Sequence, residues 1–201
     1  MAAPRPKVEL GPDDAALVVR ARGGDRWAAE TLYRRHVADA TRIAAFLLRR
    51  SAEVEDVVQD AFVTALARLG TLREPSAFGG WVARIVANEA RGRLRRRHLL
   101  GLVGLDAGTD DALLAQLAAP GATAEQRTEL ALIDRALGTL GPDERLAWTL
   151  RFVEGWKLTE VAETMRLSLA TVKRRLVCAQ QRVAAIAGTA VAGFDPEGEE
   201  P

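Results

Sequence analysis

The sequence has one cysteine, Cys178, and two histidines in 201 residues. A single cysteine excludes an intramolecular disulfide and a cysteine-based zinc site, and it fits a reducing cytosol. His36 and His98 stand far apart, and no phosphate-binding loop, metal-ligand cluster or nucleophile motif accompanies them. We therefore expect no catalytic residue, no metal, no cofactor and no enzymatic activity.

Aromatic residues are also scarce, at 5% of the chain against 48% hydrophobic residues. Aliphatic composition of this kind favours small helical bundles. The sequence has no apolar run long enough to span a bilayer, and its N-terminal stretch lacks the apolar core of a signal peptide. These observations predict a soluble, cytoplasmic, all-α protein.

Charge is nearly balanced over the whole chain, at a formal net charge of +1, but it is not balanced locally. The stretch from Trp81 to Arg97 carries six arginines and a single acid, Glu89. Residues 101–126 contain acids and no lysine or arginine, and positive charge returns within residues 173–182. Two basic centres on either side of an acidic spacer indicate two contacts with a polyanion.

Hydrophobic periodicity predicts helices throughout and no strand. In the first half, helices are expected over residues 13–22, 25–47, 54–69 and 76–98, with Ser76 as the N-cap of the last. Residues 101–123 contain four glycines and a proline, which predicts a linker. In the second half, helices are expected over residues 130–140, 142–153, 158–165 and 168–186.

The arginine-rich helix has two different sides on a helical wheel. Phe78, Val82, Ile85 and Val86 fall on one side, and Arg84, Asn88, Arg91 and Arg95 lie opposite. Guanidinium groups pair with phosphates, and an asparagine can hydrogen-bond a base edge. A solvated face is the alternative, but such faces normally mix charges of both signs. The pattern therefore favours contact with nucleic acid.

The helix over 168–186 has the pattern of a DNA-recognition helix that follows a tight turn. Its inward stripe is Val172, Leu176, Ala179 and Val183. Its outward stripe is Ala170, Arg174, Cys178 and Gln181, with Thr171 beside it and Lys173 and Arg175 flanking it. Small residues let a helix enter the major groove while cations hold the phosphates. The pattern predicts a helix-turn-helix motif, with Cys178 as an ordinary outward residue.

The segment RSAEVEDVVQDAF forms a third candidate surface. Its apolar stripe would be buried, which leaves Asp56, Asp60 and Val63 outward and Gln59 on the shoulder. An acidic face is unsuited to DNA. Spacing alone leaves open whether it faces solvent or a protein partner with basic residues.

In this order, the motifs resemble those of a bacterial ECF (extracytoplasmic function) sigma factor, a small member of the housekeeping-sigma superfamily. Region 2 would cover GDRWAAETLYRRH, EDVVQDAFVTALARL and FGGWVARIVANEARGRLRR, and region 4 would cover LGTLGPDERLAWTLRFVEGW and LTEVAETMRLSLATVKRRL. The resemblance implies a region 2 helical bundle over 12–99 and a four-helix region 4 over 127–187, joined by a flexible linker over 100–126. Residues 1–11 and the acidic tail 188–201 are expected to be disordered.

The resemblance also implies a function: binding core RNA polymerase, recognising the −35 and −10 promoter elements, and assisting promoter melting. The implied partners are promoter DNA, the clamp helices of the largest polymerase subunit and the flap of the second largest. Polymerase contact falls on Glu55, Asp56, Gln59, Asp60 and Val63. Contact with the −10 element falls on Arg84, Asn88, Arg91, Arg95 and Arg96, and the loop TLREPSAF would take a flipped base. Contact with the −35 element falls on Ser168, Ala170, Thr171, Lys173, Arg174, Arg175 and Gln181.

Four residues depart from the family pattern. Arg166 stands where the turn commonly has glycine, and Lys157 stands where a serine-like N-cap is common. Ala170 and Arg174 replace a common glycine and a common serine of the recognition helix. The −35 preference of the family is therefore not transferred to this chain.

Two other interpretations compete with this one. A LuxR-type transcription activator has a similar helix-turn-helix, but it would leave the acidic helix and the arginine-rich helix unexplained. A helical interaction protein that binds no nucleic acid would leave both basic faces unexplained. The promoter, the inducing signal and the binding of an anti-sigma factor stay open.

Overall fold

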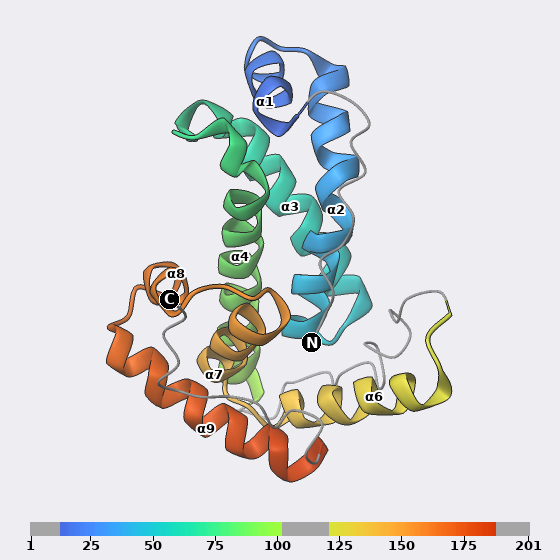
Figure 1. The fold of residues 1–201 in the computed structure, drawn as a ribbon, viewed down its shortest axis with the longest axis vertical. Coiled ribbons are helices and arrows are strands. Elements are labelled where there is room, and N and C mark those ends of the chain that lie inside the picture. The colour runs from blue at the N-terminus through green and yellow to red at the C-terminus, as the bar shows by residue number, and fades with distance from the viewer. Residues whose placement is uncertain (1–12, 102–120, 188–201) are drawn as a thin grey trace.

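The computed structural model describes residues 13–101 and 121–187, and these residues contain helices and no strand. Figure 1 shows their arrangement. The first range, called here the N-terminal bundle, holds α1 (Asp14–Arg22), α2 (Arg26–Leu48), α3 (Ser51–Ala67) and α4 (Phe78–Gly101). The second range, the C-terminal bundle, holds α6 (Ala124–Gly138), α7 (Pro142–Trp148), α8 (Leu158–Met165) and α9 (Leu169–Ala187). The all-α prediction is confirmed for this part of the chain.

The N-terminal bundle begins with two capped helices. The side chains of Asp13 and Asp25 accept hydrogen bonds from the amides of Ala16 and Ala28, at 2.8 and 3.2 Å, and so start α1 and α2. The predicted N-cap at Ser76 is wrong. A short 3₁₀ turn, Pro75–Ala77, precedes α4, and the Ser76 hydroxyl donates to the Glu74 carboxylate instead.

The C-terminal bundle begins earlier than predicted. Thr123 and Gln126 form a reciprocal capping box at the start of α6, so the predicted linker end at residue 126 lies inside a helix. Helix α7 continues into a π-helical turn, Thr149–Val153, before Gly155 takes a left-handed conformation with φ +69°. The helix predicted over residues 142–153 thus ends where expected. The predicted disordered ends and the central linker residues 102–120 lie outside the described residues.

The helix-turn-helix is formed by α8 and α9. Arg166 joins them with φ 54° and ψ 47°, in the left-handed region that glycine adopts more easily. The Ser168 hydroxyl accepts from the Thr171 amide at 3.2 Å and caps α9. The inward stripe predicted for α9 is fully buried.

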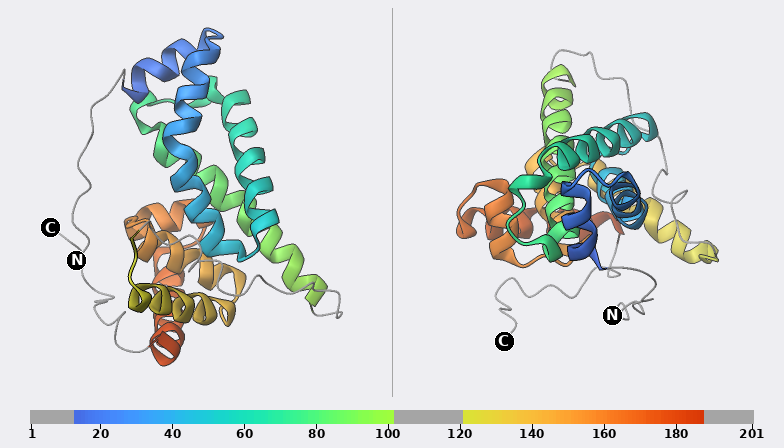
Figure 2. Two further views of the ribbon diagram at one scale, coloured as in Figure 1. Left: turned by 90° about the vertical axis from the view of Figure 1, so that its right-hand side faces the viewer. Right: turned by 90° about the horizontal axis from the view of Figure 1, so that it is seen from above.

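The two bundles pack directly against each other, which the sequence did not predict. Helix α4 runs along the N-terminal bundle and continues to α7 and α8, and α2 meets the turn Thr149–Val153 (Figures 1 and 2). The buried apolar residues of both bundles form one continuous cluster. We call the seam the contact of α2 and α4 with α7, α8 and the turn Thr149–Val153, together with the contact of Arg49 with α6.

Among the described helices, none is both long enough and apolar enough to cross a membrane.

Candidate nucleic-acid interface

Helix α3 carries an exposed acidic face with an apolar residue at its C-terminal end. Glu55, Asp56, Gln59 and Asp60 are exposed, and Val63 is 63% exposed. Arg93 of α4 reaches Asp56 at 3.3 Å and Asp60 at 2.8 Å. All five predicted residues therefore lie on the surface of one helix, above the buried stripe of Val54, Val57 and Val58.

The arginine row of α4 is partly covered, which the sequence did not predict. The row does lie opposite the buried Val82 and Val86, but the C-terminal bundle packs against part of it, so that Arg84 and Arg91 are half-buried while Asn88 and Arg95 stay exposed. Arg91 is the most enclosed member, with its side chain 13% exposed; its Nε donates to Asp143 at 2.9 Å and its Nη1 to the Met165 carbonyl at 3.1 Å. Arg84 lies 3.9 Å from Glu160 of α8. The helical wheel correctly placed these arginines opposite the buried side of α4, but it could not show that another bundle packs on them.

Asp143 is the centre of these contacts. Its carboxylate accepts hydrogen bonds from Arg91 at 2.9 Å and from Arg95 at 3.2 and 3.3 Å, and it lies 2.5 Å from Nη1 of Arg175. Partial burial raises the pKa of Asp143, but the guanidinium groups of Arg91 and Arg175 outweigh it and leave the pKa below its usual value. The carboxylate is therefore ionised at neutral pH.

Three of the residues predicted to contact the −10 element are exposed: Asn88, Arg95 and Arg96. Asn88 is exposed, and its Nδ2 donates to the Arg84 carbonyl at 2.9 Å. Arg95 has its side chain 56% exposed although it contacts Asp143, and the exposed Arg96 follows it directly. Arg22 holds the start of the loop TLREPSAF to the bundle, since it donates to the carbonyl of Leu72 in the loop and to that of Leu69 just before it.

The recognition helix α9 presents most of its predicted residues outward. Ser168, Ala170, Arg174, Cys178 and Gln181 are exposed, and Thr171, Lys173 and Arg175 are half-buried. Arg175 differs from the other predicted −35 residues, because its guanidinium contacts Asp143 of α7.

A buried polar cluster ties the two bundles together below the arginine row. Arg49 donates to Asp134 at 2.6 Å, and these residues are 8% and 1% exposed. Arg145 donates to the Leu47 carbonyl at 2.9 Å, near the C-terminal end of α2. Burial, with Arg49 and Arg97 nearby, lowers the pKa of Arg145 to about 10, which leaves it charged at neutral pH.

Comparison with known proteins identifies both bundles. Residues 32–99 match the family model of Sigma-70 region 2, and residues 130–179 match that of Sigma-70, region 4. The chain is 31% identical over 175 residues to the ECF RNA polymerase sigma factor SigM of Mycobacterium tuberculosis, across 87% of this chain and 85% of SigM. The chain belongs to the ECF sigma factors. It is also 29% identical over 178 residues to the ECF RNA polymerase sigma-E factor of Escherichia coli K12, across 85% of this chain and 92% of the relative.

A solved structure supports the fold. The sigma factor RpoE of Bartonella quintana, in complex with the anti-sigma factor NepR, aligns with a TM-score of 0.64 over 80% of this chain and 97% of that chain, at 21% identity. The N-terminal bundle of this sigma factor is thus region 2, and the C-terminal bundle is region 4. The LuxR-type interpretation is not favoured, since it leaves region 2 unmatched.

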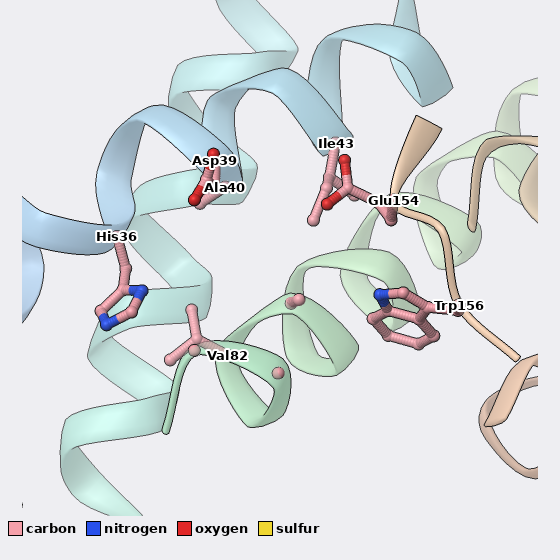
Figure 3. A pocket seen from close by; sticks show the side chains of 10 residues that line it. His36, Asp39, Ala40, Ile43, Val82, Glu154 and Trp156 are labelled. Atoms are coloured by element: carbon pink, nitrogen blue, oxygen red, sulfur yellow. The ribbon is translucent and has the colours of Figure 1, made fainter. Parts of the chain in front are cut away.

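In this sigma factor a cavity of about 250 Å³ lies at the seam (Figure 3). His36 and Asp39 of α2 and Val82 of α4 line one side, and Glu154 and Trp156 of region 4 line the other. Arg42 of α2 bridges to Glu154 with two hydrogen bonds of 3.1 Å.

Sequence reasoning missed the acids that hold region 4 against region 2. Asp134, Asp143 and Glu154 each meet an arginine of the other region. Asp143 and Glu154 carry no distinguishing motif, since acids are common at helix ends. Asp134 offered one signal, because it is a charged residue next to the apolar stripe of its helix.

Proposed function

We propose that this ECF sigma factor uses three separate surfaces: the acidic face of α3 for core RNA polymerase, α4 for the −10 element and α9 for the −35 element. The observation that carries the proposal is the distribution of charge over three helices. Helix α3 exposes an acidic face, which Arg93 of α4 contacts, while α4 and α9 are rich in arginine and belong to different regions. Acidic side chains repel phosphates and attract basic protein surfaces.

The polymerase contact is proposed for Glu55, Asp56, Gln59, Asp60 and Val63. The four polar side chains offer acceptors to cationic residues, and Val63 offers an apolar anchor at the C-terminal end of the face. The clamp helices of the largest polymerase subunit are the proposed partner. The flap of the second-largest subunit is the proposed partner of region 4.

The −10 contact is proposed for Arg84, Asn88, Arg91, Arg95 and Arg96. In this group the arginines would hold phosphates while the amide of Asn88 reads a base edge. The loop TLREPSAF lies directly before α4 and would take a flipped base. Unstacking one base costs a few kcal/mol, which these phosphate contacts would offset.

The −35 contact is proposed for the exposed side of α9, namely Ser168, Ala170, Thr171, Lys173, Arg174, Arg175 and Gln181. The small Ala170 permits close approach of the helix to the groove floor. Arg174 is the candidate guanine reader, because an exposed guanidinium at this position can bond two acceptors of one base.

In this role the protein acts as a non-catalytic subunit in the cytoplasm, where its polymerase and promoter partners are found. A regulatory partner of the anti-sigma class is part of the proposal, by analogy with the RpoE–NepR pair.

Reconstitution tests the proposal directly. Purified protein and core polymerase are incubated with fragmented genomic DNA, and the transcript starts are sequenced. We expect starts that share −10 and −35 elements and that require this protein. If the protein gives no transcription with core polymerase alone but stimulates a holoenzyme that already carries another sigma factor, a LuxR-type activator would be favoured instead.

A further inference from the structure

The seam brings together arginines from both DNA-contacting helices. Arg91 and Arg95 of α4 and Arg175 of α9 all approach the carboxylate of Asp143. Arg91 and Arg95 belong to the proposed −10 contact, and Arg175 belongs to the proposed −35 contact. A carboxylate and a phosphate bind guanidinium groups through the same paired-oxygen geometry. The Asp143 carboxylate therefore forms with arginines of both surfaces the kind of ion pair that a DNA phosphate would form.

The same contacts mask part of the proposed −10 face of α4. Arg91 is nearly enclosed, and its second hydrogen bond goes to the Met165 carbonyl, at the end of the helix that precedes the turn. Arg84 lies between Glu160 and the Trp156 ring, whose centroid is 5.9 Å from its guanidinium carbon. Arg91 cannot reach a phosphate while α7 and α8 rest on it, whereas Asn88, Arg95 and Arg96 stay exposed.

We propose that the seam is an autoinhibitory contact, in which Asp143 acts as an internal substitute for promoter phosphate and keeps the free sigma factor closed. The proposal rests on the proposed function, since it concerns the same arginines. In the closed state, region 4 masks Arg91 of the −10 face, and Arg175 of the −35 face is paired with Asp143 within region 4 itself. Arg91 must leave region 4, and Arg175 must leave Asp143, before these two arginines can reach promoter phosphate.

The surface proposed to bind polymerase remains accessible in the closed state. Asp56 and Asp60 have side chains 67% and 61% exposed, and Val63 is exposed beside them. Core polymerase can therefore bind α3 first and hold region 4 away afterwards. This order gives the closed contact a function, because the free sigma factor would not occupy promoters without polymerase.

The remaining seam contacts make spontaneous opening unfavourable. The Arg49–Asp134 pair is buried, and the Arg42–Glu154 pair is half-buried. Opening would expose these groups together with apolar surface at the contact of α4 and α7. A partner that binds only the open state shifts the equilibrium by its differential affinity.

A distance measurement tests the closed state. Cys178 is the only cysteine of the chain and is exposed on α9, so Arg26→Cys at the exposed start of α2 supplies one label in each region. In the free protein we expect one narrow distance distribution. Saturating core polymerase should replace it with a longer distance. A broad distribution in the free protein, or an unchanged one in holoenzyme, overturns the proposal.

Asp143→Asn tests the carboxylate itself. The free variant should bind a −35 duplex and a −10 single strand about five- to tenfold more tightly than wild type, because the arginines lose a charge-assisted partner. Glu163→Gln is the matched control: it removes one negative charge from α8 at an exposed position and should leave both affinities unchanged. Equal gains in the two variants would mean general electrostatics and would overturn the proposal.

Transcription at saturating core separates this inference from the proposed function. Asp143→Asn should transcribe like wild type there, because the polymerase has already opened the seam. Absence of transcription with the wild-type protein would refute the sigma-factor role. Normal transcription with no gain in free DNA binding by Asp143→Asn would refute only the autoinhibitory contact. Adding Glu154→Gln, which removes a second seam ion pair, should increase the gain further.

Discussion

Arginine serves different purposes in this molecule, and the surroundings of each side chain decide which. Arg49 and Arg145 are buried and bind a carboxylate and a helix-end carbonyl. Arg91 is enclosed between two regions, while Arg96 stays exposed. A buried guanidinium needs its partners, whereas an exposed one can exchange water for phosphate at little cost. Substitutions of the same residue type should therefore give different results.

At the residue scale, Asn88 and Arg96 should differ in their effect on promoter binding. In holoenzyme, Arg96→Ala should lower the slope of log affinity against log salt by about 0.9, because one phosphate is no longer neutralised by a guanidinium. Asn88→Ala should leave that slope nearly unchanged and alter the −10 preference. The measurement is salt titration on one promoter and its −10 point mutants. An unchanged preference in Asn88→Ala would remove it as a base reader.

The acidic face of α3 gives a second prediction at this scale. Changing Asp56 and Gln59 together to alanine should weaken core-polymerase binding, by roughly 1.5–3 kcal/mol for each charge-assisted hydrogen bond that the substitutions remove. Folding should be preserved, since both side chains are exposed. Glu30→Ala is the control, because it removes an equally exposed acid from α2. Normal competition for core by the double variant would show that polymerase binds elsewhere.

At the scale of elements, the helices could be predicted from sequence more completely than the surfaces that pack against them. The stripe of α3 and the inward stripe of α9 were identified because each helix buries one face at a fixed period. Arg166 in the left-handed turn followed from the family resemblance, which placed it where the turn commonly has glycine. The seam could not be predicted, since periodicity reports which face is buried by the helix's own bundle. Nothing in that pattern shows that a second bundle covers the arginine row.

Helix α6 offers a test of how closely the seam is packed. A Cβ added at Gly138 would collide with the guanidinium of Arg49, so Gly138→Ala should displace Arg49 from Asp134 and destabilise the protein. Gly92 in α4 has nothing within 4 Å of its added Cβ, and Gly92→Ala should stabilise by about 0.5–1 kcal/mol through helix propensity. Urea unfolding of both variants measures the contrast. Equal stabilisation would mean that Arg49 moves aside freely.

The buried pair itself gives the larger effect. Asp134→Asn should lower the free energy of unfolding by about 3–5 kcal/mol, because it leaves the Arg49 charge buried without a counter-ion. Arg145 lies in the same cluster, which adds to the uncompensated charge. Glu30→Gln, in the exposed pair with Arg34, should cost at most about 0.5 kcal/mol. A decrease of the same size in both variants would contradict the buried assignment.

For the whole molecule, the distance between the two promoter elements sets a geometric limit. Elements separated by two helical turns lie roughly 70 Å apart. The segment between the end of α4 at Gly101 and the start of α6 at Ala124 could span at most roughly 75–80 Å if fully extended. A free coil of this length averages only about 25–30 Å. Reaching both elements thus requires both an open seam and an extended connection.

The last prediction concerns this limit. The free protein should bind a promoter carrying both elements weakly, with little preference over a duplex carrying the −35 element alone, because extending the connection costs conformational entropy. Core polymerase should restore a strong preference for the two-element promoter, since it holds the regions apart. Anisotropy titrations on the two duplexes, and on a third whose spacer is altered by half a helical turn, provide the measurement. If the free protein binds the two-element promoter tightly and discriminates against the altered spacer, it reaches both sites unaided, and polymerase is not needed to separate the regions.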